Sequence, residues 1–343
     1  MFVIPGVPLG NSMIFARRQA EALARLGVMV ELFFLSSRTS PWRLFRSWVD
    51  FRRCVQISRA QVVHAHFGTV TALFAAVAAP FHPLVITFRG GDLNAAPKAA
   101  PRTDRLRSWL GRAISQAAAL RASRIVCVSR QIHSKLWWRK GRSRVLPSGV
   151  DTAIFFPQPR WLARQKLGWS REPMVVLFNA GGRDWIKRPR LARQAVDFAR
   201  RYVPDIRLEE IDGSLDPLQV PVLMNAADCL LLTSATEGSP TVVQEALACG
   251  LAVVAVKVGD TEERLAHSRR SRLAEDTPEA LGEALCEVLL DQESSGAAPL
   301  EAGLQRELAS IASDRIAAEL RDIYAVLAYG SRRNRARVHG SAP

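Results

Sequence analysis

Two glutamates, Glu237 and Glu245, stand with seven residues between them in the stretch EGSPTVVQE. The short apolar runs 229–233 (CLLLT) and 252–256 (AVVAV) flank this stretch, and they predict two strands buried on both faces of a parallel sheet. A helix between the strands would place Glu245 about 8 Å along the axis from Glu237, at about 1.5 Å per residue. One carboxylate could then hold the hydroxyls of a sugar on one side of a diphosphate, and the other could hold ribose hydroxyls on the far side.

The start of this helix is a candidate phosphate site. Ser239 is expected to cap the helix, Pro240 suits its first position, and Gly250 ends it. Unpaired N–H groups and a partial positive charge at a helix start favour phosphate, so we expect phosphate near the amides from Gly238 to Thr241. The alternative is that both glutamates are solvated charges at the helix end, and spacing alone does not separate the two.

A second pair of charged residues, Arg183 and Lys187, follows another predicted strand, 174–179 (MVVLFN). They lie in the loop GGRDWIKR, before a helix expected to run to about Tyr202. Glycines let the backbone approach a ligand closely, and the two cations could neutralise charge that grows on a departing diphosphate. Taken alone, a basic loop of this kind is more often an ordinary solvated surface.

The N-terminal half places Arg89 and Asp92 just after the predicted strand 84–88 (LVITF), at the end where open α/β sheets bind ligands. The run 61–67 (QVVHAHF) predicts a strand with His64 and His66 on one face. Such histidines are usually packed or hydrogen-bonded core residues. No third ligand has a suitable spacing, so no metal site is expected.

The stretch EGSPTVVQEALACG, followed by LAVVAVKVGDTEE, resembles the nucleotide-sugar motif of the retaining glycosyltransferases of family 4, which have the GT-B fold. The resemblance implies that Glu237 contacts the donor sugar and Glu245 the ribose, with Glu263 at a further glutamate position. It also implies that Arg183 and Lys187 act on the diphosphate.

The sequence departs from the family pattern at two places. A histidine that touches the donor sugar commonly stands where this chain has Arg89, whereas Asp92 keeps the pattern. Arginine suits a carboxylate or phosphate, so this substitution can mean that the donor or the acceptor is acidic. It can also mean that another residue makes the contact with the donor sugar. The paired glycines that often follow the first strand are replaced by separate Gly6 and Gly10. Gly10 and His66 complete the candidate substrate contacts.

Length and patterning predict two domains. A chain of 343 residues with a hydrophobic fraction of 48% can form two cores, and alternating strands and helices indicate parallel sheets. The expected α/β architecture is GT-B, with two Rossmann-like, doubly wound parallel-sheet domains facing across a cleft. We expect an acceptor-binding domain at residues 1–157 and a nucleotide-sugar-binding domain at residues 158–315. A helix at residues 316–330 is expected to cross back to the first domain, and a disordered basic tail is expected at residues 331–343.

Charge is distributed unevenly. Residues 1–150 hold 23 Lys and Arg against 5 Asp and Glu, a net of +18, whereas residues 151–343 carry a net of −3. The segment 41–53 (PWRLFRSWVDFRR) places Trp42, Phe45, Trp48 and Val49 near one helical face among arginines. Such a helix can lie in an anionic membrane interface, although an ordinary surface helix has the same pattern. Nucleic-acid binding is a weaker alternative, because we find no recognised motif for it.

Other features indicate a cytosolic protein. The five cysteines are scattered and lack a Cys-x-x-Cys spacing, which is typical of reduced thiols. The start MFVIPGVP has no basic residues before its apolar ones, so no signal peptide is expected. The apolar stretch 70–88 is interrupted by Pro80 and Pro83, which predicts a helix and a strand instead of a membrane span.

These observations lead to an expected function. We expect a cytoplasmic enzyme, peripheral to the inner face of the plasma membrane, that moves a sugar from a nucleotide-diphosphate sugar to a lipid-linked or polysaccharide acceptor with retention. No cofactor or metal is expected, because the chain has no Asp-x-Asp motif and cationic side chains can take that role. A nucleotide-sugar epimerase or a non-catalytic subunit of the same fold remains the alternative.

Overall fold

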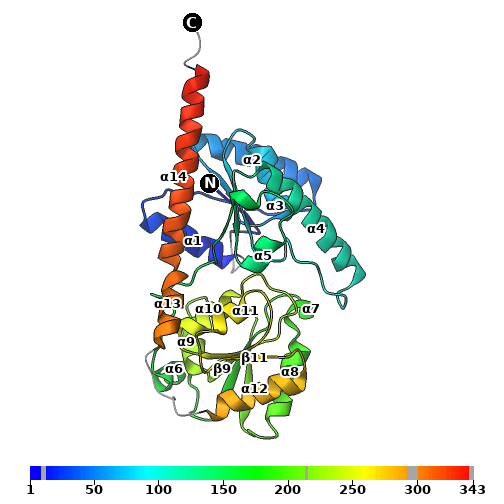
Figure 1. The fold of residues 1–343 in the computed structure, drawn as a ribbon, viewed down its shortest axis with the longest axis vertical. Coiled ribbons are helices and arrows are strands. Elements are labelled where there is room, and N and C mark those ends of the chain that lie inside the picture. The colour runs from blue at the N-terminus through cyan, green and yellow to red at the C-terminus, as the bar shows by residue number, and fades with distance from the viewer. Residues whose placement is uncertain (9–12, 213–214, 292–299, 340–343) are drawn as a thin grey trace. The chain divides into compact units, whose positions relative to one another are not determined.

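The computed structural model describes residues 1–8, 13–212, 215–291 and 300–339; Gly10 lies outside these ranges. The chain divides into two compact units, Met1–Ser148 with Ser313–Pro343, and Gly149–Ala312. Each unit is a parallel sheet with helices on both faces (Figure 1). The expected α/β architecture of two parallel-sheet domains is confirmed.

The sheet of the first unit has six parallel strands in the order β2-β1-β3-β4-β5-β6. Strand β4 (Leu84–Phe88) matches its prediction, whereas β3 (Val63–Ala65) is shorter than the predicted 61–67, and β2 covers Leu32–Leu35. Strand β1 (Phe2–Pro5) pairs with β2 along all four residues, from Phe2 opposite Leu32 to Pro5 opposite Leu35, whereas β3 pairs with β1 only at His64 and Ala65. The remaining strands are β5 (Arg124–Cys127) and β6 (Ser143–Val145).

Helices cover both faces of this sheet, because alternate strand residues point to opposite sides. Val3 and Ile86 pack with one group of helices, and Phe2, Ile4 and Val85 pack with the other. The first group is α2 (Pro41–Ile57), α3 (Thr69–Ala78) and α4 (Arg102–Arg121); the second is α1 (Ile14–Arg25) and α14 (Ser313–His339). The short helices α5 (Arg130–Ser134) and η1 (Lys140–Arg142) precede β6.

The last helix, α14, belongs to the first unit and lies beside α1 (Figure 1). Ile316, Ala317 and Leu320 are buried against the sheet. The helix is continuous from Ser313 to His339, so it passes through the expected boundary at residue 316 and through most of the segment expected to be a disordered tail. Within the described residues, no helix is both long and apolar enough to cross a bilayer.

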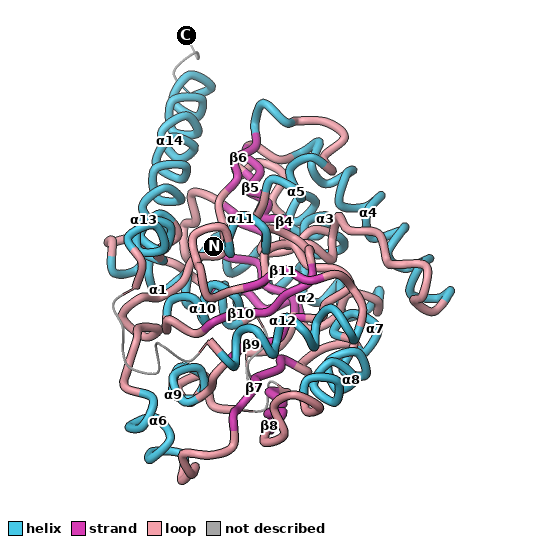
Figure 2. Tube along the Cα trace, turned by 60° about the horizontal axis from the view of Figure 1, so that its bottom comes forward, coloured by secondary structure: helices cyan, strands magenta, loops and turns pink. Residues whose placement is uncertain are grey.

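The sheet of the second unit has five parallel strands in the order β11-β10-β9-β7-β8 (Figure 2). Strands β7 (Met174–Asn179) and β10 (Ala252–Val256) match their predictions, and β9 (Cys229–Leu232) is one residue shorter than predicted. The other strands are β8 (Ile206–Ile211) and β11 (Arg272–Ala274). The reversal of strand order at β7 makes this a doubly wound sheet.

The helices of the second unit are α6 (Arg160–Leu167), α7 (Asp184–Lys187), α8 (Pro189–Ala199), α9 (Val220–Ala226), α10 (Thr241–Ala248), α11 (Thr261–Leu265), α12 (Pro278–Leu290) and α13 (Ala302–Ser310). Helices α8 and α12 pack together, as do α6 and α9. The helix expected to run to Tyr202 is two helices, because the backbone turns at Arg188, which has a φ of 56°.

The connection into the second unit differs from the expected boundary at residue 157. The backbone N–H of Val150 donates to the carbonyl oxygen of Ile311 at 3.0 Å, and the Phe155 side chain is buried in the second core. The Asn225 side chain bonds both the carbonyl of Phe156 and the N–H of Gln158. Residues 149–157 therefore pack with the second unit.

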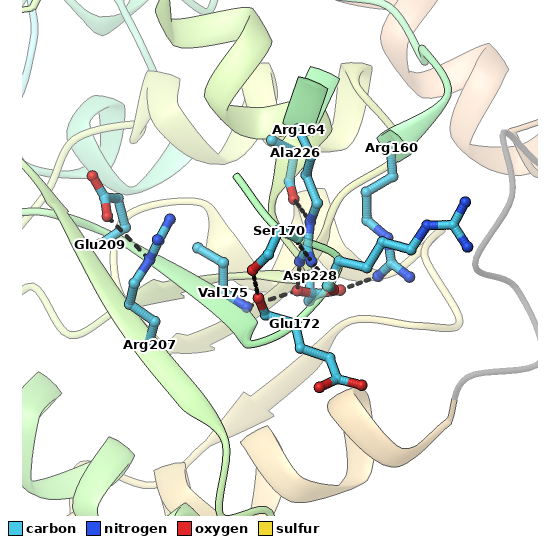
Figure 3. Close-up of polar contacts among 10 residues, drawn as sticks. Arg160, Arg164, Ser170, Glu172, Val175, Arg207, Glu209, Ala226 and Asp228 are labelled. Carbon is cyan, nitrogen blue, oxygen red and sulfur yellow. Dashed lines mark hydrogen bonds and ion pairs between the residues drawn. The ribbon is translucent and has the colours of Figure 1, made fainter. Parts of the chain in front are cut away.

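A buried ion pair fixes α6 to the sheet (Figure 3). The Nη2 of Arg164 lies 2.7 Å from Oδ2 of Asp228, and the same oxygen accepts from the N–H of Val175 at 2.7 Å. Arg164 also donates to the carbonyl of Ala226, and Arg160 forms a second ion pair with Asp228. Val175 and Asp228 stand at the amino ends of β7 and β9, opposite the loops that follow these strands.

Candidate functional site

The carboxyl ends of β7 and β9 bring two candidate residues together. The Nζ of Lys187 lies 2.7 Å from Oε1 of Glu237, and the side chains are only 15% and 19% exposed. Two hydrogen bonds hold the loop after β7 against the loop after β9. The N–H of Ala235 donates to the carbonyl of Ile186 at 2.7 Å, and the Thr233 hydroxyl donates to the carbonyl of Lys187 at 2.6 Å. The cation and the carboxylate are therefore positioned by the backbone.

The glycines before α7 are required by the loop geometry. Gly182 has a φ of 132°, and a Cβ on Gly181 would lie 3.1 Å from the carbonyl oxygen of Asp212. The loop leaves Arg183 exposed, with its guanidinium carbon 5.9 Å from the centre of the Trp185 ring. The structure thus brings Lys187 to Glu237 and places Arg183 four residues away on the exposed side of the loop.

The predicted cap of α10 is wrong. The Ser239 hydroxyl donates to Oδ2 of Asp260 at 2.7 Å and accepts from Nε2 of Gln244 at 2.7 Å. The helix begins at Thr241 with Pro240 in the capping position and without a side-chain cap. Because no side chain in the described structure caps the first turn, its N–H groups remain suited to a phosphate.

The two glutamates of the motif occupy different kinds of structure, as their spacing suggested. Glu237 lies in the loop after β9, and Glu245 is half-buried in α10. Glu263 is exposed on α11. The helix therefore separates the two carboxylates along its axis.

Sequence reasoning missed the residues that hold the loop before α10. Asp260 is buried and accepts from Nε of Arg264 at 2.9 Å, and Arg264 also forms an ion pair with Glu307. Burial raises the pKa of Asp260, while Arg264 and the Ser239 hydroxyl oppose this shift. A Cβ on Gly259 would lie 3.0 Å from the carbonyl oxygen of Gly238, so the two loops are in close contact. The sequence signal that could have identified Asp260 is its position just after the apolar run 252–256, where a predicted strand ends.

In the first unit, Asp92 shapes the loop that carries Arg89. Its side chain is buried, and its carboxylate accepts from the backbone N–H groups of Gly68 (2.9 Å), Arg89 (3.0 Å) and Gly90 (2.9 Å). Burial raises the pKa of Asp92, and these N–H groups oppose the shift. Asp92 therefore positions the loop of Arg89, and its own carboxylate is buried in backbone hydrogen bonds.

The two histidines of β3 and its end are buried and hydrogen-bonded. The rings of His64 and His66 have centroids 4.0 Å apart; His64 bonds the hydroxyls of Tyr324 and Thr87, and Nδ1 of His66 lies 2.9 Å from Nη2 of Arg89. Burial, with Arg89 nearby, holds the pKa of both histidines well below the usual 6.5. Both are neutral at physiological pH. The described residues contain no group of three His, Cys, Asp or Glu side chains arranged to hold a metal ion.

Comparisons with known proteins show the family of this chain. The family model described as Glycosyltransferase Family 4 matches residues 11–154, and the one described as Glycosyl transferases group 1 matches residues 175–291. D-inositol 3-phosphate glycosyltransferase of Pseudarthrobacter chlorophenolicus is 30% identical over 162 residues, which cover 39% of this chain and 38% of that protein. The chain thus spans about two fifths of the length of the curated relatives it matches.

Solved structures share the fold over nearly the whole chain. Sucrose-phosphate synthase of Thermosynechococcus elongatus superposes with a TM-score of 0.74 at 18% identity, covering 95% of this chain and 98% of that one. HepE of Anabaena, solved with UDP-glucose, has a TM-score of 0.70 at 17% identity, covering 95% and 98%. From both family matches, the two parallel sheets and the GT-B neighbours, we conclude that the chain belongs to glycosyltransferase family 4 and has the GT-B fold.

Proposed function

We propose that this protein moves a sugar from a nucleotide-diphosphate sugar to a lipid-linked or polysaccharide acceptor, with retention at the anomeric carbon. The observation that carries the proposal is the 2.7 Å pair of Lys187 and Glu237 beside the uncapped start of α10. This arrangement offers a cation and backbone N–H groups to a diphosphate and a carboxylate to the adjoining sugar. The HepE structures with UDP and UDP-glucose support a nucleotide-sugar donor for this fold.

The proposed reaction uses the leaving group itself. The bond between the anomeric carbon and the diphosphate oxygen breaks, and the acceptor oxygen bonds the same carbon from the same face. The acceptor's hydroxyl proton passes to the departing phosphate oxygen. Lys187, Arg183 and the start of α10 stabilise the growing negative charge, and Glu237 orients the sugar. We further propose that the reaction needs no metal or cofactor, because these cations supply the charge that a metal would otherwise provide.

We also propose that the protein lies on the inner face of the plasma membrane and acts in polysaccharide synthesis. On α2, Trp42 and Phe45 are 67% and 55% exposed, and their rings stack at 6.1 Å among the exposed Arg43 and Arg46. Exposed aromatics with arginines suit an anionic lipid surface. Trp48 stacks on Phe45 at 6.1 Å, as expected for the same face, but it is half-buried against the core, so the proposed membrane contact is made by the outer residues of the helix.

A thermal-shift screen against UDP, GDP, ADP, CMP and their sugar conjugates tests the donor site. A ligand that binds only the folded state stabilises it by RT ln(1 + [L]/Kd), so a ligand at a hundred times its Kd contributes about 2.7 kcal/mol. We expect one nucleoside diphosphate to raise the melting temperature, and less so in Glu245→Ala. Release of that nucleotide only when acceptor is present would then distinguish transfer from epimerisation. Absence of any shift would contradict the proposed donor site.

A further inference from the structure

Arg89 is a half-buried cation whose guanidinium, within the described residues, contacts neutral groups. Its Nη1 donates to the hydroxyl of Ser148 and its Nη2 to Nδ1 of His66, each at 2.9 Å. Its guanidinium carbon lies 4.1 Å from the centre of the Phe15 ring. The four residues come from separate parts of the first unit, so the fold holds the guanidinium in one place.

Among the described residues, the two fully buried arginines have acidic partners. Arg164 pairs with Asp228 at 2.7 Å, and Arg264 pairs with Asp260 at 2.9 Å. Among the described residues, no carboxylate lies within 4.0 Å of the Arg89 guanidinium, because Asp92 directs its oxygens to backbone N–H groups. Burial lowers the pKa of Arg89 to about 9, with Asp92 opposing the shift, so the side chain is still a cation at neutral pH.

A cation removed from water without a counter-charge is costly, and such a group is normally paired or bound to a ligand. The guanidinium is planar and retains N–H donors beyond the two that Ser148 and His66 accept, which suits a phosphate or carboxylate. It also stands at the carboxyl end of β4, where open α/β sheets bind ligands. These features favour an anionic ligand over a structural role alone.

We propose that Arg89 binds a phosphate or carboxylate group of the acceptor, with His66 and Ser148 as positioning residues. The inference rests on the proposed function, because it names the chemical class of the acceptor. The donor's diphosphate is assigned to the second unit, which has Lys187, Arg183 and the α10 start for it. We therefore assign the anion at Arg89 to the acceptor, and the test below separates it from a group of the donor.

The test uses the full chain and inorganic phosphate as the probe, in the presence of saturating UDP so that the donor site is filled. Melting temperature is followed against phosphate, with potassium chloride at matched ionic strength as the reference. We expect phosphate to stabilise the wild type and the control Arg124→Met, a half-buried arginine at the amino end of β5 in the same sheet. In Arg89→Met the apparent phosphate Kd should rise at least tenfold, while stabilisation by UDP is kept.

Arg89→His gives a second variant in case the methionine variant does not fold, and it should lose phosphate binding in the same way. Equal stabilisation by phosphate in the wild type and both Arg89 variants would overturn the proposal. Loss of UDP binding together with phosphate binding would also overturn it, because Arg89 would then serve the donor. A phosphate effect that depends on Arg89 in a protein that binds no nucleotide would keep the anion site and reject the proposed function.

Discussion

Lys187 and Glu237, which are fifty residues apart in the sequence, meet with 2.7 Å between Nζ and Oε1. The bonds from Ala235 to Ile186 and from Thr233 to Lys187 set this contact through the backbone. A partly buried pair of this kind keeps both charges oriented before a ligand arrives, and preorganised charge is what stabilises a departing diphosphate. The pair is therefore the part of the proposed site whose disruption should affect turnover most.

Replacing either member of this pair should largely abolish sugar transfer. We expect Glu237→Gln or Lys187→Ala to lower kcat by about a hundredfold to a thousandfold, the usual loss when a preorganised charge is removed. Release of nucleotide from the donor, measured with acceptor present, gives the rate, and far-UV circular dichroism reports folding.

The matched control is Glu210→Gln, which alters an exposed glutamate paired with Arg193 at 2.9 Å in the same unit. This variant should keep its rate, because an exposed pair contributes only about 0.2–1 kcal/mol. Rates near that of the wild type in both Glu237→Gln and Lys187→Ala would refute the assignment of the site.

The outer face of α2 should determine affinity for anionic membranes. Burying each exposed aromatic contributes about 1.5–3 kcal/mol, so the double variant Trp42→Ser, Phe45→Ser should bind anionic vesicles at least tenfold more weakly. Co-sedimentation with phosphatidylglycerol and phosphatidylcholine vesicles measures this. Trp161→Ser, which removes an exposed tryptophan of α6, is the control and should bind as the wild type does. Unchanged binding by the double variant would leave the membrane proposal without support.

Acid should destabilise the first unit through its buried histidines. The pKa values of His64 and His66 lie well below 6.5 in the folded protein, so below pH 6.5 the unfolded chain binds protons that the folded chain does not. Their contribution is present above pH 6.5 and is lost as the pH falls, by about 1.4 kcal/mol per pH unit for each histidine.

Urea unfolding between pH 6 and pH 5 measures the contribution of His66 to the unfolding free energy. His66→Asn should reduce the dependence of the unfolding free energy on pH by about one proton. If the unfolding free energy depends on pH equally in His66→Asn and the wild type, His66 accepts a proton in the folded state, which contradicts the prediction.

Breaking the buried ion pair of Figure 3 should cost much more stability than breaking an exposed one. Asp228→Asn leaves Arg164, whose side chain is 5% exposed, without its negative partner, and we expect a loss of about 3–5 kcal/mol. Asp197→Asn breaks the exposed pair with Arg200 in the same unit and should cost no more than about 0.5 kcal/mol. Chemical denaturation measures both, and similar losses in the two variants would contradict the importance of burial.

The sequence alone determined the local elements and the spacing of the motif. Strands β4, β7 and β10 match their predictions because continuous apolar runs bounded by turn residues are local signals. The sequence also predicted that Glu237 precedes a helix and that Glu245 lies within it, because the rise per residue of a helix fixes their separation along the axis.

The tertiary structure decided which side chains meet. Ser239 has the residue type of a helix cap, yet its hydroxyl bonds Asp260, because the loops after β9 and β10 pack together across the sheet edge. Likewise, Ser148, His66 and Phe15 surround Arg89 only because the parallel sheet brings the ends of distant strands to one edge. Spacing along the chain cannot predict such contacts, since they depend on strand order and on how loops pack over the carboxyl ends.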